Sequence, residues 1–247
     1  MKKHKEYIQE NSELPQSDGK IAGDRKTLLA DTLRQRIMSM ELAPGAVVDE
    51  VTLSAEFGLS RPPVRELMRQ LAAEGYIELE ANRPARVSAM NYHSLRSFFL
   101  AAPLIYTATS QLAATHATPD DVARLKEIQE RFRAAMDQND AWGRVFYNDQ
   151  FHYEIGLIAR NDYLLPSLRR LQIDHARIAK TFYRAQPSDD MQQDMNEAVH
   201  QHDLIIDAIA CHDVAAIDEL IRAHWELSRR RLADYVMPEG VVIPLSF

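Results

Sequence analysis

The stretch from Gly58 to Gly75 constrains the fold more than any other part of the chain, because it has the pattern of a tight turn followed by a short helix. Gly58 can end one helix in a left-handed conformation, and the Ser60 side chain can accept hydrogen bonds from the free amides of the next helix. Pro62 and Pro63 are tolerated in a first helical turn, where their missing N–H groups would have no partner anyway. The stretch therefore predicts a helix-turn-helix.

The helix after this turn has two different faces. Its apolar residues follow the i, i+3, i+4, i+7 rule and predict a buried stripe of Val64, Leu67, Met68 and Leu71. Arg61, Arg65 and Arg69 recur every fourth residue on another face. Guanidinium groups in that position can bind phosphates or guanine edges in a DNA major groove. The alternative is a merely solvated face, with the arginines offset by Glu66 and Glu74.

The flanking segments favour DNA binding over a solvated face. Residues 28–38 and 53–58 predict two helices before the turn, the first with Leu29, Leu33 and Ile37 at helical spacing. After Gly75, residues 76–80 and 85–88 read as two strands around a turn at 81–84. Three helices followed by a hairpin are the plan of a winged helix.

These residues resemble the DNA-binding domain of the GntR family of bacterial transcription regulators, in the runs 42–45, 53–61, 63–66 and 71–77. The resemblance implies that Arg61 and Arg65 contact the operator and that the wing tip at Arg83 enters the adjacent minor groove. The family usually carries glycine at the position of Met40 and often at that of Pro84. The residues expected to bind DNA are Ser60, Arg61, Pro62, Pro63, Arg65, Arg69, Arg83 and Arg86.

The overall charge limits how such binding can arise. With 36 acidic and 29 basic residues the formal net charge is -7, which disfavours loose binding to any polyanion. Affinity must come from a local basic patch and from dimerisation, and we expect added salt to weaken it. The single cysteine, Cys211, cannot form an internal disulfide, and we expect a buried thiol in a reducing cytoplasm. The most apolar stretch, residues 98–109, is too short to span a membrane.

We divide the chain into four parts. Residues 1–24 are polar and predict a flexible tail, and residues 25–90 predict the winged helix with its small β-hairpin. Residues 91–235 predict an all-helical effector-binding and dimerisation domain of about six helices, followed by an apolar C-terminal tail at 236–247. Breaks between these helices are expected at 118–120, 139–140, 161–162, 186–188 and 212–213, with Thr118 and Ser188 as helix caps. The fold class is therefore mainly α.

Three histidines of the predicted bundle, His152, His202 and His224, lie on aliphatic stripes of three separate helices. A single histidine on an apolar face is usually a hydrogen-bonded core residue. Three of them favour a shared reason for burial, and a divalent metal ion supplies one. Asn148 lies one helical turn before His152, so its amide oxygen can join them.

The same helices resemble the FCD effector domain of the FadR branch of GntR regulators, in the runs 148–152, 202–209 and 220–224. The resemblance implies zinc, nickel or manganese held by Asn148, His152, His202 and His224, with aspartate the common choice at the first position. Neutral ligands leave the metal its double charge, so we expect a small anionic effector, a carboxylate or sugar acid. The family commonly carries arginine and glutamate where this chain has Ala102 and Tyr106, so Tyr106 and Arg177 are the further effector contacts we expect.

The residues thus predict a homodimeric, ligand-responsive transcription factor that binds a roughly palindromic double-stranded operator, and not an enzyme. A zinc enzyme also needs a general acid or base beside the metal, whereas the flanking stripes are mostly aliphatic. The chain has no His-Glu-x-x-His motif and no phosphate-binding glycine loop. A third alternative is a constitutive DNA-binding dimer whose histidines are structural.

Overall fold

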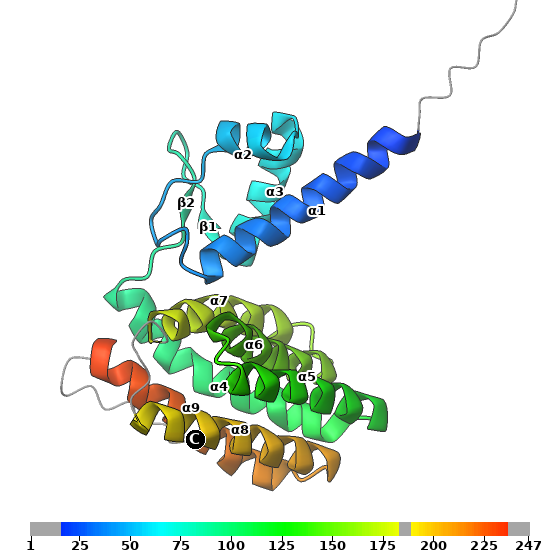
Figure 1. Cartoon of the computed structure of the whole chain (residues 1–247), viewed down its shortest axis with the longest axis vertical. Helices are drawn as coiled ribbons and strands as arrows, with labels where there is room; N and C mark the ends of the chain where they lie inside the picture. Colours follow the sequence, from blue (N-terminus) through cyan, green and yellow to red (C-terminus); the bar gives the residue numbers. More distant parts are fainter. Residues whose placement is uncertain (1–15, 183–188, 237–247) are drawn as a thin grey trace, which may run out of the picture.

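The computed structural model describes residues 16–182 and 189–236, which form two units connected between β2 and α4 (Figure 1). The first unit contains α1 (Gln16–Met38), α2 (Glu50–Phe57), α3 (Arg61–Glu74), β1 (Ile77–Glu78) and β2 (Arg86–Val87). The second contains α4 (Tyr92–His116), α5 (Pro119–Asp137), α6 (Ala141–Ile158), α7 (Leu164–Phe182), α8 (Asp189–Ala210) and α9 (Val214–Val236). The predicted fold class, mainly α with a small hairpin and a C-terminal helical bundle, is confirmed.

The first unit packs around α3. The apolar stripe of α3 is buried as predicted and meets the stripe of α1 in one core; its most buried members are Leu29, Leu33, Ile37, Val64, Leu67, Leu71 and Val87. β1 and β2 pair antiparallel, with Ile77 opposite Val87. The two strands are shorter than the sequence predicted, and a single bridge from Val47 to Arg86 extends the sheet.

Gly58 and Gly75 end α2 and α3 in the left-handed conformation, as predicted, with φ of 60° and 92°. The predicted cap by Ser60 is wrong. Ser60 is the N-cap residue of α3, but its side chain accepts no capping hydrogen bond. Such a cap accepts from the second or third helical N–H, and Pro62 and Pro63 occupy those two positions without an N–H. The Ser60 hydroxyl is left exposed at the end of α3.

α1 begins earlier than predicted, since residues 16–24, assigned to a flexible tail, are helical. These residues have no apolar periodicity, so a pattern of buried positions does not reveal them. Polar contacts hold the adjoining part of the helix in place, because Arg25 donates to the Gly58 carbonyl and Lys26 pairs with Glu66. Residues 1–15 and the C-terminal tail after residue 236 lie outside the described residues, as does the predicted cap Ser188.

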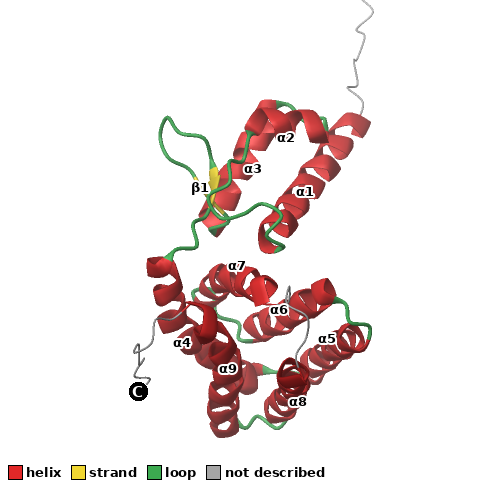
Figure 2. Cartoon of the chain, turned by 60° about the vertical axis from the view of Figure 1, so that its left-hand side comes forward, coloured by secondary structure: helices red, strands yellow, loops and turns green. Residues whose placement is uncertain are grey.

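The second unit is a bundle around a separate core (Figure 2). α4 packs along α9 and α5 along α6, whereas α7 lies against α4 and α6 and also contacts α1 and α3 of the first unit. Thr118 caps α5 in a capping box, as predicted. Cys211 is exposed in the turn after α8, so the prediction of a buried thiol is wrong. Within the described residues, no helix is long and apolar enough to cross a membrane.

Met40, in the turn after α1, has a φ of 60°, the left-handed region that glycine adopts without strain. A residue with a Cβ pays about 1–2 kcal/mol there, partly offset because glycine makes the unfolded chain more flexible. We therefore expect Met40→Gly to raise the free energy of unfolding by about 0.5–1 kcal/mol, measured by urea denaturation. Met40→Ala keeps the Cβ and is the matched control. Equal stability of the two variants would contradict the strain at this position.

Candidate functional site

Three predicted metal ligands meet in the centre of the bundle. His152 comes from α6, His202 from α8 and His224 from α9, and one ring nitrogen of each lies within 4.8 Å of the other two. The three side chains are buried, with exposed fractions of 4%, 0% and 7%. Their ring centroids are 4.8–5.5 Å apart. The fold therefore brings together three positions that the sequence could only place on separate helices.

Two glutamines orient these rings. The Gln129 amide donates to the Val199 carbonyl and to Asp203, so its oxygen is left to face His202 Nδ1 at 3.1 Å. Gln201 donates to Glu197, and its oxygen faces His224 Nδ1 at 2.9 Å. An amide oxygen can only accept, so each Nδ1 carries the proton and each Nε2 keeps its lone pair. Metal-binding histidines commonly have such a hydrogen bond on the ring nitrogen that does not bind the ion, and it fixes the orientation and the tautomer of the ring.

The environment keeps the imidazoles neutral. Burial lowers the pKa of His152 and of His202 well below its usual range, and the neighbouring His224 lowers both further. Burial lowers the pKa of His224 to about 4. Neutral imidazole is the form that binds a metal ion, so at neutral pH no proton has to leave first. His202 Nε2 is buried and has no hydrogen-bond partner among the described residues, an arrangement that a metal ion would satisfy.

Asn148, the fourth predicted ligand, lines a cavity of about 60 Å³ together with His175, His224 and Met195. A smaller hollow of about 10 Å³ adjoins the rings of His152 and His224. The neighbouring Asp149 also lines the larger of these cavities, but its carboxylate is not among the clustered ligand atoms. Burial raises the pKa of Asp149 to about 8.

The two predicted effector contacts lie in different places. Tyr106 is buried, its ring centroid is 4.9 Å from that of His152, and its hydroxyl shares a 3.0 Å hydrogen bond with His175 Nδ1. Arg177 lines neither cavity at the histidines. It is fully buried and donates to the Ser88 carbonyl, at the end of the wing, while pairing with Asp174.

Sequence reasoning missed four residues of the site: Gln129, Arg144, His175 and Gln201. A signal existed for two of them. Arg144 lies one turn before Asn148, so the rule that found Asn148 also finds it. His175 lies between Leu171 and Ile178 on a buried stripe, like the other three histidines. No local pattern shows that Gln201 faces His224, because the contact joins α8 to α9.

The predicted DNA-binding residues lie around the start of α3 and at the wing, and all of them are exposed except Pro63, which is half-buried. Arg61 and Arg65 both pair with Glu50 of α2, at 2.5 and 2.7 Å, and they lower the pKa of that carboxyl. Arg69 is exposed on the same helix. At the wing, Arg83 pairs with Glu80, and Arg86 donates to the Gly45 carbonyl. Glu50 thus holds two of the predicted DNA-contacting arginines side by side.

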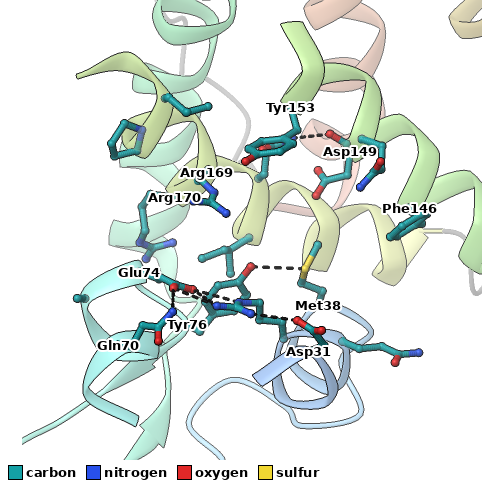
Figure 3. A pocket seen from close by; sticks show the side chains of 18 of the residues that line it. Asp31, Met38, Gln70, Glu74, Tyr76, Phe146, Asp149, Tyr153, Arg169 and Arg170 are labelled. Carbon is teal, nitrogen blue, oxygen red and sulfur yellow. Dashed lines mark hydrogen bonds and ion pairs between the residues drawn. The ribbon is translucent and has the colours of Figure 1, made fainter. Parts of the chain in front are cut away.

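A larger cavity, of about 850 Å³, lies between the two units (Figure 3). α1 and α3 line one side, where the Arg34 guanidinium donates to both carboxylate oxygens of Glu74 at 3.0–3.1 Å. α6 and α7 line the other side with aromatic and cationic side chains, including Tyr153 and Arg169. Asp149 lines both this cavity and the one at the histidines, so α6 and α7 form a wall shared by the two.

The buried histidines make the stability of the metal-free protein depend on pH. His175 and His224 have a pKa of about 4 in the folded state, against about 6.5 in an unfolded chain. Below about pH 6.5 the unfolded chain binds more protons, so the free energy of unfolding falls by up to about 1.4 kcal/mol per pH unit for each histidine. We expect urea denaturation of chelator-treated protein to show this loss between about pH 6.5 and 4.

The matched control is His200→Ala, because His200 is an exposed histidine on α8. Replacing it leaves the buried cluster intact and should leave the pH dependence unchanged. Equal stability of the wild-type protein at neutral pH and at about pH 5 would contradict the burial of neutral imidazoles.

Comparison with known proteins assigns both units. Residues 26–87 match the family described as "Bacterial regulatory proteins, gntR family", and residues 104–227 match the FCD domain. The chain is 24% identical to the gluconate operon transcriptional repressor of Bacillus subtilis over 206 residues, covering 83% of this chain and 84% of that protein. It is also 24% identical to the Nta operon transcriptional regulator of Aminobacter aminovorans, over 54% of this chain and only 63% of that protein.

Among solved structures, the Escherichia coli protein McbR/YncC has the same fold. The TM-score is 0.71 at 18% identity, with 85% of this chain and 96% of that chain covered. Together with the winged helix and the histidine-lined bundle, these matches place the molecule: the chain belongs to the GntR family of bacterial transcriptional regulators and carries an FCD effector domain.

Proposed function

We propose that this regulator, a member of the FadR branch, binds a divalent metal ion at His152, His202, His224 and Asn148 and senses a small anionic metabolite there. The observation that carries the proposal is the convergence of three buried, neutral imidazoles whose ring nitrogens lie within 4.8 Å of one another. Zinc, nickel or manganese suits such ligands. When bound, the ion supplies a fixed double positive charge with coordination positions open to an outside ligand.

The chemistry of the effector follows from this ligand set. Three imidazoles and an amide carry no charge, so an anion is needed to compensate the ion. Tyr106, whose ring packs against that of His152, would supply its ring and hydroxyl as one wall of the effector site. A relative at 24% identity is named as a gluconate operon repressor, which favours a sugar acid or another carboxylate. The known relatives are regulators, which favours sensing over the zinc-enzyme alternative.

Arg177 is better suited to transmit a signal than to hold the effector. Its guanidinium lies on α7, two residues after His175, and donates at 2.8 Å to the Ser88 carbonyl of the segment that connects the wing to α4. A shift of α7 caused by effector binding would therefore move this segment. A ligand acts only as far as it binds the two arrangements with different affinity. In a homodimer, such shifts would change the spacing of the two winged helices on a palindromic operator.

Replacing His152 tests the metal site. We expect His152→Ala to lose its metal ion, because only two imidazoles remain, while the protein folds and binds its operator in the absence of effector. Native mass spectrometry after incubation with zinc, nickel and manganese measures the metal content. His200→Ala is the control, since His200 lies two residues from His202 but is exposed. A wild-type protein without metal, or a His152→Ala variant that retains it, would refute the proposed site.

Replacing Arg65 tests the DNA-binding face. If Arg65 contacts a base edge, Arg65→Ala should weaken binding to the operator by about 1–3 kcal/mol, and it should discriminate less between bases at the contacted position. Fluorescence anisotropy with a duplex selected by the wild-type protein measures the loss. Arg131→Ala, on the exposed face of α5, is the control. Unchanged operator affinity of Arg65→Ala would show that another face of the unit reads the DNA.

A further inference from the structure

One buried arginine of the effector domain has no carboxylate beside it among the residues that the structure describes. Arg144, in the first turn of α6, is 5% exposed. Its guanidinium donates to the Asn139 side chain and, at 3.4 Å, to Met195 Sδ, while its Nε has no hydrogen-bond partner. Within residues 16–182 and 189–236, no carboxylate lies within 4.0 Å of it. A buried cation in this state is costly unless something else compensates it.

Arg177 is a buried arginine whose charge is compensated within the protein. Arg177 is fully buried, as Arg144 nearly is, but it forms an ion pair with Asp174 and a hydrogen bond to the Ser88 carbonyl. The charge of Arg177 is therefore compensated by a carboxylate of the protein, whereas no carboxylate of the described residues compensates that of Arg144. For Arg144 the missing anion must come from outside the described residues.

Arg144 also faces the cavity of the proposed metal site. Residues 144, 148 and 152 recur every fourth position of α6 and so share one helix face. Arg144, Asn148 and His224 line the same cavity of about 60 Å³, and Met136 and Met195 line it too. One of the three clustered histidines, His224, and a buried guanidinium, that of Arg144, therefore line the same cavity.

We propose that this cavity binds a short dicarboxylate at two points, with one carboxylate at the metal-bearing histidines and the other on Arg144. The proposal rests on the metal site proposed above and specifies its effector. A guanidinium binds a carboxylate through two parallel hydrogen bonds, which would satisfy the free Nε. A monocarboxylate can compensate only one of the two cationic ends. The small volume of the cavity selects a chain of few carbons.

The experiment is isothermal titration calorimetry of the nickel-loaded full-length protein with probes matched in carbon number. Malonate is compared with propionate, succinate with butyrate, and glutarate with valerate. We expect at least one diacid to bind at least tenfold more tightly than its monoacid partner. In Arg144→Gln this preference should disappear, because the diacid loses affinity at least tenfold while the monoacid changes little.

Three further measurements make the outcome decisive. Arg131→Gln removes an exposed arginine of α5 and should keep the preference for diacids. Arg144→Lys keeps the positive charge but loses the planar guanidinium, so it should bind the diacid with intermediate affinity. This variant also tests the proposal if Arg144→Gln fails to fold. Metal content, measured for each variant, should equal that of the wild type, because Arg144 is not among the proposed metal ligands.

The proposal is overturned if wild-type protein binds monoacids as tightly as diacids, or if a folded Arg144→Gln retains the preference. These results differ from a failure of the metal site itself. If the wild type binds no metal but still takes up a diacid in an Arg144-dependent manner, the anion site stands and the metal proposal falls. If metal binds normally and no diacid does, the metal site stands and the dicarboxylate proposal falls.

Discussion

The burial of neutral imidazoles where α6, α8 and α9 meet is the constraint on which the effector domain depends. Burial of each ring removes its polar nitrogen atoms from water. Each ring therefore needs a polar partner, which apolar core side chains cannot supply. Gln129 and Gln201 satisfy the Nδ1 atoms of His202 and His224, and their own amide groups are anchored to neighbouring backbone and carboxylate oxygens. The Nε2 of His202 remains unsatisfied in the centre. The network therefore both builds the core and leaves a place for an ion.

α7 connects this centre to the DNA-binding unit. His175 on α7 lines both cavities at the histidines, whereas Arg169, on the same helix, lines the cavity between the units. Arg177, farther along the helix, contacts the segment after the wing. Packed helices shift as rigid bodies and do not deform continuously. A displacement of α7 at one cavity therefore also moves the residues of α7 that line the other cavity. The arrangement offers a short physical route from effector to operator.

Local sequence was most informative where a single segment decides its own conformation. The turn at Gly58, the buried stripe of α3 and the cap at Thr118 were predicted because each depends on neighbours within one or two helical turns. The first turns of α1 were missed because they lack an apolar pattern. The Ser60 side chain was predicted to cap α3, but it does not, because Pro62 and Pro63 lack the N–H groups from which such a cap accepts. Both errors concern polar interactions, which leave little periodic signal.

Reading along the chain was enough to find the helices and to place three histidines on apolar stripes, because apolar periodicity and turn residues act locally. The family followed from the resemblance of particular runs to those of GntR regulators. Which side chains face one another depends on how the helices pack, and local patterns do not show it. The partners of His202 and His224 come from residues 73 and 23 positions away, and the contact of Arg177 with Ser88 spans 89 positions. That no carboxylate of the described residues pairs with Arg144 likewise follows from tertiary packing, since a sequence rich in carboxylates does not show which of them lies near a given arginine.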